Sequence, residues 1–162
     1  RNDNMIRINR ITDYINSGKL YDLLDKIYKS TSFINSEYKN YYEWYYNIQV
    51  PRILNNEGEI IYLTVGVDNI IGVISLKNTE YEKKICTLYI DSEYREMHLG
   101  TILLEMGLEY LETDKPVITF NERKKVMFQS FVDRYEWIET SRVNYLNRVE
   151  LSYNDKTLVK KK

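Results

Sequence analysis

Apolar residues in the first third of the chain recur at the spacing of amphipathic helices. Residues 10–28 carry apolar side chains three or four positions apart, and the pattern is interrupted near Ser17 and Gly18. Residues 36–48 place tyrosines and a tryptophan on one helical face, and Pro51 should end that helix or begin a new turn. The pattern therefore predicts two helices in this part of the chain.

Beyond residue 58 the spacing changes to the short apolar runs and alternation that are typical of strands. The polar pair Asp68-Asn69 separates two such runs and predicts a hairpin. In chain order we predict strands over 59–67, 70–76 and 84–90, a loop over 91–96, a helix over 99–111, a strand over 116–120, a helix over 122–135, and strands over 137–140 and 144–153.

This order predicts an α/β (α+β) fold with a mixed, mostly antiparallel, twisted sheet flanked by helices. Only the central β-loop-α-β unit requires a parallel pair of strands with a right-handed crossover. The chain has 162 residues and no linker-like segment, so we expect one domain over 1–156. Residues 157–162 form a basic tail that we expect to be disordered.

Composition narrows the classes of function. The formal net charge is -1, so no overall field would draw the chain to nucleic acid or to an anionic membrane. No run approaches the roughly 20 apolar residues of a membrane span, and no secretory pattern opens the chain, so we expect a cytoplasmic protein. With one cysteine and one histidine, an internal disulfide is excluded and a metal site is not expected. Cys86 fits a small buried side chain.

The strongest chemical signal is the strand, polar loop and helix start over residues 88–101. Loop amides and a helix N-terminus favour anions, because their N–H groups lack acceptors and the helix dipole is positive there. Arg95 would add charge-assisted hydrogen bonds, and Gly100 permits close approach of a ligand to the backbone. A cofactor that carries a diphosphate fits this pattern.

The same stretch resembles motif A of the GNAT superfamily of N-acetyltransferases. Residues 88–90 match the strand of that motif, Tyr94 and Arg95 match the start of its loop, and Gly100 matches its last glycine. His98 stands where the family usually has its first glycine, so its side chain requires an allowed backbone conformation or contacts a phosphate. The predicted order of helices and strands also agrees with the family over nearly the whole chain.

The resemblance implies that acetyl-CoA is the cofactor. In this family backbone groups of the strand pair with the pantetheine arm, and the loop amides hold the diphosphate. The cofactor-binding residues implied here are Leu88, Tyr89, Ile90, Arg95, Glu96, Met97, His98, Leu99, Gly100, Thr101 and Asn121.

The catalytic residues are not identified by the resemblance. The family often uses a tyrosine to protonate the departing thiolate, but Val132 stands at that position and Glu136 replaces a following glycine. Tyr135 lies about one helical turn farther on and is a weak candidate, with packing as the simpler role. Glu82 and Glu80, in the turn before the cofactor strand, are weak candidates for a base, with solvated hairpin charges as the simpler role.

An acceptor site is expected between the N-terminal helices and the sheet. Tyr42 and Tyr45 belong to an aromatic cluster that would hold a cationic amine by cation–π contact, with Glu37 or Glu43 supplying negative charge. The same aromatic residues also suit the core or a homodimer interface.

We therefore predict an acetyl-CoA-dependent N-acetyltransferase that transfers an acetyl group directly to a primary amine of a small molecule or peptide. One alternative is an impaired acyl-CoA-binding or sensor module, because His98 and Val132 depart from the family pattern. Another is an enzyme that acts on aminoacyl-tRNA, which would need residues such as Arg123, Lys124 and Arg134, together with Lys125, to form one basic face.

Overall fold

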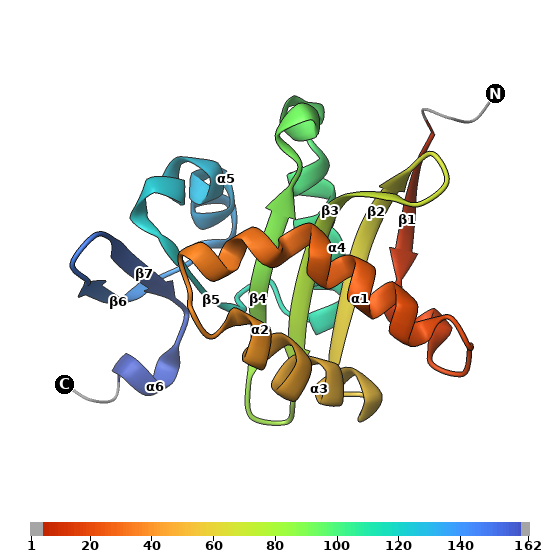
Figure 1. Cartoon of the computed structure of the whole chain (residues 1–162). Coiled ribbons are helices and arrows are strands. Elements are labelled where there is room, and N and C mark those ends of the chain that lie inside the picture. The colour runs from red at the N-terminus through yellow and green to blue at the C-terminus, as the bar shows by residue number, and fades with distance from the viewer. Residues whose placement is uncertain (1–4, 160–162) are drawn as a thin grey trace.

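A seven-stranded sheet runs through the part of the chain that the computed structural model describes, residues 5–159. Figure 1 shows the strands, in the spatial order β1-β2-β3-β4-β5-β7-β6. Their bounds are β1 Ile6–Arg10, β2 Gly58–Val65, β3 Asn69–Asn78, β4 Lys83–Ile90, β5 Val117–Asn121, β6 Glu139–Asn144 and β7 Val149–Tyr153. Neighbouring strands are antiparallel except β4 and β5, which are parallel. The predicted mixed, mostly antiparallel sheet with a central β-loop-α-β unit is confirmed.

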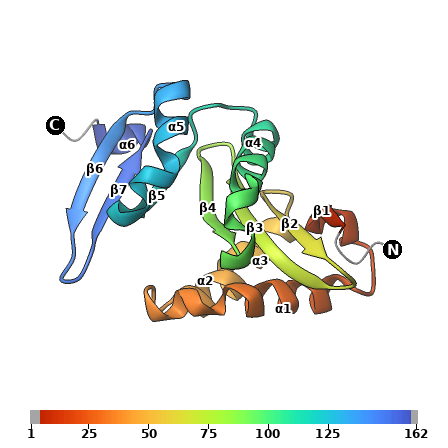
Figure 2. The ribbon, with the colours of Figure 1, turned by 90° about the horizontal axis from the view of Figure 1, so that it is seen from above.

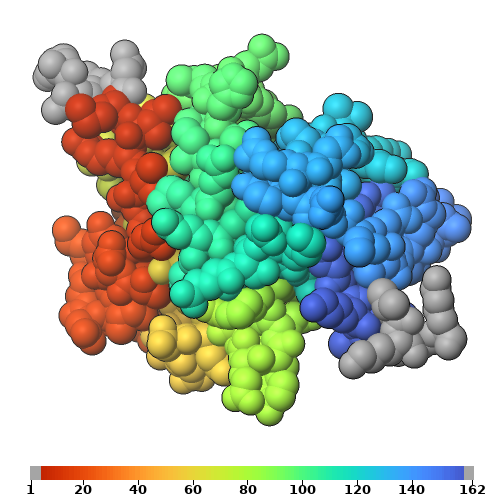
Figure 3. Space-filling model, turned by 180° about the vertical axis from the view of Figure 1, so that it is seen from behind, coloured from red at the N-terminus to blue at the C-terminus, as the bar shows by residue number. Residues whose placement is uncertain are grey.

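Helices cover both faces of the sheet, as Figure 2 shows. One face carries the N-terminal helices η1 Ile11–Tyr14, α1 Leu20–Thr31, η2 Ser32–Ser36, α2 Tyr41–Trp44, η3 Tyr45–Gln49 and α3 Val50–Leu54. The other carries α4 Leu99–Leu111 and α5 Lys125–Tyr135, preceded by the short turns η4 Ser92–Met97 and η5 Glu122–Lys124. From behind, α4 and α5 lie side by side (Figure 3). Over residues 5–159, no helix has the length and apolarity to cross a membrane.

Two apolar layers hold these helices on the sheet. Leu24 and Ile27 of α1 pack with Ile60 of β2 on one face, and Leu103 of α4 packs with Ile74 of β3 on the other. All five side chains are almost fully buried, and burial of each contributes about 1.5–3 kcal/mol of hydrophobic free energy.

The helical region differs in detail from the prediction. The interruption near Gly18 separates η1 from α1, and the helix expected to end near residue 48 continues as η3 and α3 to Leu54. Pro51 lies at the start of α3, directly after the π-helical turn η3, and because it has no N–H it cannot donate to a carbonyl of the preceding turn.

Two strand predictions need correction. Strand β1 was not expected, because its alternating Ile6-Arg7-Ile8-Asn9 pattern is short and leaves Ile8 half exposed at the sheet edge. The last two strands lie at Glu139–Asn144 and Val149–Tyr153, so the turn falls at residues 145–148 and not near residue 141.

Of the segment expected to be a disordered tail, Thr157 to Val159 belong to helix α6 (Lys156–Val159), and residues 160–162 lie outside the described residues.

Candidate active site

Strand β4 loses its partner on one side partway along its length. It pairs with β5 only at Lys84 and Ile85, whereas its pairing with β3 continues to Ile90. A register shift in that ladder leaves Cys86 without an opposite residue, which is a β-bulge. Because backbone groups on an unpaired edge need other hydrogen-bond partners, the second half of β4 is a template for an extended ligand.

A cavity of about 710 Å³ lies at this separation of the two strands. Its walls come from the η2–α2 region, the hairpin of β3 and β4, β5, the start of α5 and β7. Tyr41 and Trp44 form its aromatic wall, and Thr87 and Leu88 contribute from β4. The cavity therefore adjoins the unpaired part of β4 on the side of the N-terminal helices.

The η2–α2 segment connects the two separated parts of the sheet. The Phe33 ring lies 4.9 Å from the Tyr89 ring of β4. On the far side, Tyr38 donates a hydrogen bond of 2.6 Å to Glu150 of β7, and Asn121 of β5 donates one of 3.5 Å to Glu37. This segment thus closes one side of the cavity and brings its own polar groups toward β5 and β7.

Glu150 is the most enclosed carboxylate in the cavity wall, with 8% of its surface exposed. Its Oε2 accepts from the Tyr38 hydroxyl and lies 3.4 Å from Nε of Arg148. The Arg148 guanidinium lies 4.7 Å from the centre of the Tyr38 ring and 4.5 Å from that of Tyr145. Burial, followed by the hydrogen bond to Glu150, raises the pKa of Tyr38, so its hydroxyl stays protonated.

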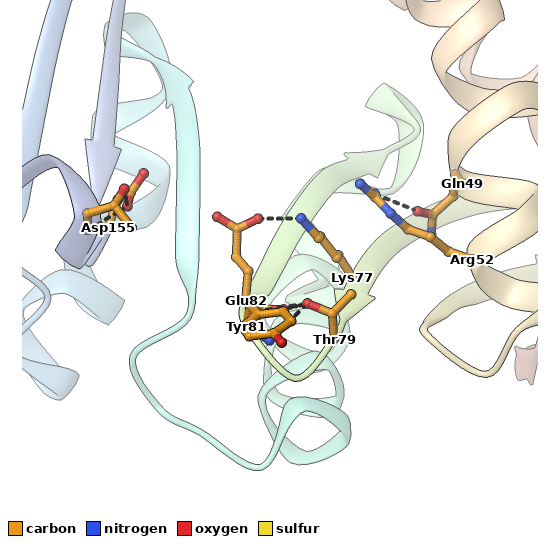
Figure 4. Close-up of polar contacts among 8 residues, drawn as sticks. Gln49, Arg52, Lys77, Thr79, Tyr81, Glu82 and Asp155 are labelled. Carbon is orange, nitrogen blue, oxygen red and sulfur yellow. Dashed lines mark hydrogen bonds and ion pairs between the residues drawn. The ribbon is translucent and has the colours of Figure 1, made fainter.

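The opposite end of the cavity, toward the β3–β4 turn, is basic. Lys77 pairs with Glu82 at 2.7 Å, and Arg52 contacts the Gln49 side chain at 3.4 Å; Figure 4 shows both contacts. Lys84 lies opposite Lys77 across the hairpin and also lines the cavity. We call Arg52, Lys77, Lys84 and Glu82 the basic end.

The basic end surrounds the thiol at the bulge. Burial raises the pKa of Cys86, whereas the charges of Lys84, Arg52 and Lys77 oppose that rise. Since the thiol stays mostly protonated at neutral pH, the structure gives no sign of a reactive cysteine.

The loop after β4 forms a turn with a free helix N-terminus. Asp91 caps η4 by accepting from the Glu93 amide, and Arg95 donates from Nε to the carbonyl of Ile90 at 3.1 Å. His98 takes the left-handed conformation, with φ 59°, and α4 begins at the next residue. The first amides of α4 have no intrahelical acceptors, and no acidic residue lies in its first turn. This turn is therefore open to an anion.

The structure brings together only part of the predicted site. Leu88, Asn121 and Glu82 line the cavity. Tyr89, Ile90 and the remaining loop residues, Arg95, Glu96, Met97, His98, Leu99, Gly100 and Thr101, lie along the upper part of β4 and the turn into α4.

Two predicted substrate residues lie elsewhere. Tyr45 is fully buried in the helix–sheet core, where its hydroxyl donates to the carbonyl of Leu24, so it has no surface for a substrate. Tyr42 is half exposed and packs on Tyr28 outside the cavity lining. Tyr135 likewise lies outside the lining, with its ring beneath the Arg134 guanidinium.

Sequence reasoning missed Arg148 and Glu150. The available signal was a charged residue within an alternating apolar strand, Val149-Glu150-Leu151, but alternation alone does not tell a solvated face from a cavity wall. Among residues 5–159, no cluster of histidine, cysteine and acidic side chains is arranged to hold a metal ion.

Comparison with solved structures agrees with this architecture. A candidate GNAT-family acetyltransferase from Desulfovibrio desulfuricans has a TM-score of 0.62 at 12% identity, covering 91% of this chain and 96% of that chain. A candidate acyl-CoA N-acyltransferase from Klebsiella pneumoniae has a TM-score of 0.53 at 11% identity over the same shares, 91% and 96%. The ribosomal-protein-S18-alanine N-acetyltransferase from Escherichia coli has a TM-score of 0.51 at 12% identity, covering 60% of this chain and 67% of that chain. At these identities the similarity shows the fold alone.

This chain thus shares its fold with these acyltransferase structures. Residues 19–122 match the sequence model of the acetyltransferase (GNAT) family, and this range includes the whole stretch from α1 to β5. The chain belongs to that family. No curated protein gives a significant sequence match.

Proposed function

We propose that this protein is an acetyl-CoA-dependent N-acetyltransferase that acts on a primary amine of a small molecule or peptide. The observation that carries the proposal is the unpaired second half of β4, which faces a cavity of about 710 Å³ and leads into a free helix N-terminus.

The residues present fit acetyl-CoA. Backbone groups of Leu88 to Ile90 lie on the edge of β4 that is free to pair with a pantetheine arm. The amides of Leu99, Gly100 and Thr101 suit a diphosphate, because they lack intrahelical acceptors at the positive end of α4. A Cβ added at Gly100 would meet only Ile90, at 3.8 Å, so packing within the protein does not require glycine there. Bound acetyl-CoA would supply an activated thioester.

The chain's own groups then have defined roles. The Tyr41 and Trp44 wall excludes water and orients the acceptor amine. With acetyl-CoA bound, a free backbone amide of β4 would be available to polarise its thioester carbonyl. We assign proton removal from the amine to Glu150, because it is the most enclosed carboxylate of the cavity wall and Tyr38 orients one of its oxygens, whereas Glu82 lies in the β3–β4 turn at the other end of the cavity.

Calorimetric titration of acetyl-CoA tests the cofactor assignment. We expect binding that Arg95→Ala weakens, because this arginine joins the carbonyl end of β4 to the turn and adds positive charge. Arg7→Ala is the matched control, since Arg7 is an exposed residue of β1 at the far edge of the sheet. No binding by the wild-type protein would refute the proposal.

Thiol release against a panel of primary amines tests the reaction. Release with one class of amine supports acetyl transfer, and binding of acetyl-CoA without release from any amine favours the sensor alternative.

The tRNA alternative receives little support, since Lys124 lines the cavity while Arg134 pairs with Glu105 at 3.2 Å, so these residues do not form one basic face.

A further inference from the structure

The cavity is positively charged, although the whole chain has a formal net charge of -1. Its lining contains more cationic than anionic side chains. The cations are Lys39, Arg52, Lys77, Lys84, Lys124 and Arg148, and the carboxylates are Glu37, Glu82 and Glu150. Two of those carboxylates are already paired with cavity cations, Glu82 with Lys77 and Glu150 with Arg148. A polycationic acceptor is therefore disfavoured in this cavity.

The excess charge is concentrated at the basic end. Lys77 and Lys84 are direct cross-strand neighbours, an arrangement of like charges that costs stability. Arg52 adds a third cation from α3, and Glu82 is the one carboxylate of this group. Among residues 5–159, no carboxylate lies within 4.0 Å of the charged nitrogens of Arg52 or Lys84. Within the described part of the chain, two cations thus face the cavity without a carboxylate partner.

The basic end is separate from the turn that suits the cofactor diphosphate. Lys84 and Ile90 lie near opposite ends of β4, six residues apart, which is about 20 Å of strand. The diphosphate at the α4 N-terminus therefore does not neutralise Arg52 and Lys84. Thr87, beside the bulge, lies three residues from Lys84, or about 10 Å. A ligand that reacts near the bulge can reach the basic end with a short chain.

We infer that the acceptor is an amine that carries a carboxylate, and that Arg52 and Lys84 bind this carboxylate while the amine lies beside the β4 bulge. The inference rests on the proposed acetyltransferase function and names its substrate class. A single negative charge suits the site, because Glu82 remains nearby. Charge-assisted hydrogen bonds from two cations give such an acceptor an advantage of at least about tenfold over a neutral one.

Three amines with the same five-carbon chain provide the test. They are 5-aminopentanoate, pentylamine and 1,5-diaminopentane, whose distal groups are negative, neutral and positive. With acetyl-CoA, we expect kcat/KM to decrease in that order, with at least a tenfold step from the first to the second. Equal values, or a preference for the diamine, would overturn the inference.

Substitutions of Arg52 and Lys84 test whether these residues cause the preference for the carboxylate. Arg52→Gln and Lys84→Gln each should lower the ratio of kcat/KM for 5-aminopentanoate to that for pentylamine by about tenfold. Lys29→Gln, an exposed change on α1 outside the cavity lining, should leave this ratio unchanged. A ratio that neither cavity variant lowers would remove these residues from the site.

Two further experiments distinguish a carboxylate on the acceptor from one on the acyl group, and the carboxylate site from the acetyltransferase function. If succinyl-CoA with pentylamine exceeds acetyl-CoA with 5-aminopentanoate, and Arg52→Gln abolishes that excess, the carboxylate belongs to the acyl group and the acceptor assignment is wrong. Calorimetric titration of the three amines into the protein with coenzyme A needs no turnover. Preferential binding of 5-aminopentanoate without any thiol release would refute the acetyltransferase function and keep the carboxylate site. Thiol release with no preference among the three amines would support the acetyltransferase function and refute the carboxylate site.

Discussion

Glu150 combines enclosure with a fixed orientation. Tyr38 and Arg148 hold one of its carboxylate oxygens, and the side chain lines the cavity. Substitution by glutamine keeps the size and removes the basic oxygen, so Glu150→Gln should lower kcat/KM by about 10²–10⁴-fold. Steady-state kinetics measures this loss.

The matched control is Tyr38→Phe, which keeps the ring beneath Arg148 and removes only the hydroxyl donor. We expect Tyr38→Phe to cause a smaller loss of kcat/KM than Glu150→Gln. If Glu150→Gln keeps more than a third of the wild-type rate, another group takes the proton.

His98 tests how the diphosphate turn accommodates a side chain. Its φ of 59° costs a non-glycine residue roughly 1 kcal/mol, and a β-branched residue more. His98→Val should therefore reduce the free energy of unfolding by about 1 kcal/mol and weaken acetyl-CoA binding, whereas His98→Gly should preserve both. Urea unfolding measures the free energy of unfolding, and calorimetry measures the affinity for acetyl-CoA. Marked loss of affinity in His98→Gly alone would instead indicate that the imidazole contacts a phosphate.

Glu59 gives a pH-dependent contribution to stability. It is buried in β2, where it accepts hydrogen bonds from Thr12 and from the Ile60 amide, and burial raises the pKa of its carboxyl despite these bonds. Because the pKa is higher in the folded state, the stabilisation is fully present below the unfolded value of about 4.5 and is lost as pH rises through the folded value.

Glu59→Gln keeps the acceptor for both amides and removes the charge. Its free energy of unfolding, relative to that of the wild type, should rise between pH 4 and pH 8. Urea titrations at several pH values measure this difference. A difference that is constant with pH would show that the carboxyl titrates alike in both states.

At the scale of elements, the close packing of α4 against the sheet depends on Gly107. A Cβ at this position would lie 2.9 Å from Cδ1 of Ile74, closer than real contacts, so the end of this buried side chain must move within a packed core. Gly107→Ala should therefore destabilise the protein by about 1–3 kcal/mol in chemical unfolding, despite the better helix propensity of alanine. Gly18→Ala is the control, because a Cβ there meets nothing within 4 Å and its effect should stay within about 0.5 kcal/mol. Equal effects of the two changes would refute this packing argument.

The elements that the sequence predicts well are those whose periodicity is strong and local. The hairpin of β2 and β3 and the helix α4 follow directly from apolar spacing and turn residues. The separation of β4 from β5 has no such signal, since it is an absence of pairing along an otherwise ordinary strand. Aromatic side chains at helical spacing were equally ambiguous, because only tertiary packing decides that Tyr41 lines the cavity while Tyr45 lies in the core.

At the scale of the molecule, the sheet behaves as two parts joined by a narrow contact. The strands β1 to β4 form one part and β5 to β7 the other, and the β4–β5 ladder contains only the pairs Lys84–Val117 and Ile85–Ile118. The Tyr38–Glu150 hydrogen bond adds a second connection from the η2–α2 segment. A ligand along the free edge of β4 would contact both parts, so its binding free energy adds to the stability of their arrangement.

Hydrogen exchange can test this coupling. Without ligand, amides of residues 86–90 that point away from β3 should exchange fast, because no strand partner accepts from them. Saturating acetyl-CoA should slow these amides and those of the η4–α4 turn, while β2 and β3, already paired on both sides, change little. Arg95→Ala should reduce the protection at equal cofactor concentration, and Arg7→Ala should not. Uniform protection of the whole sheet would indicate global stabilisation only, whereas protection confined to the edge of β4 and the turn would locate the cofactor along the opening between the two parts.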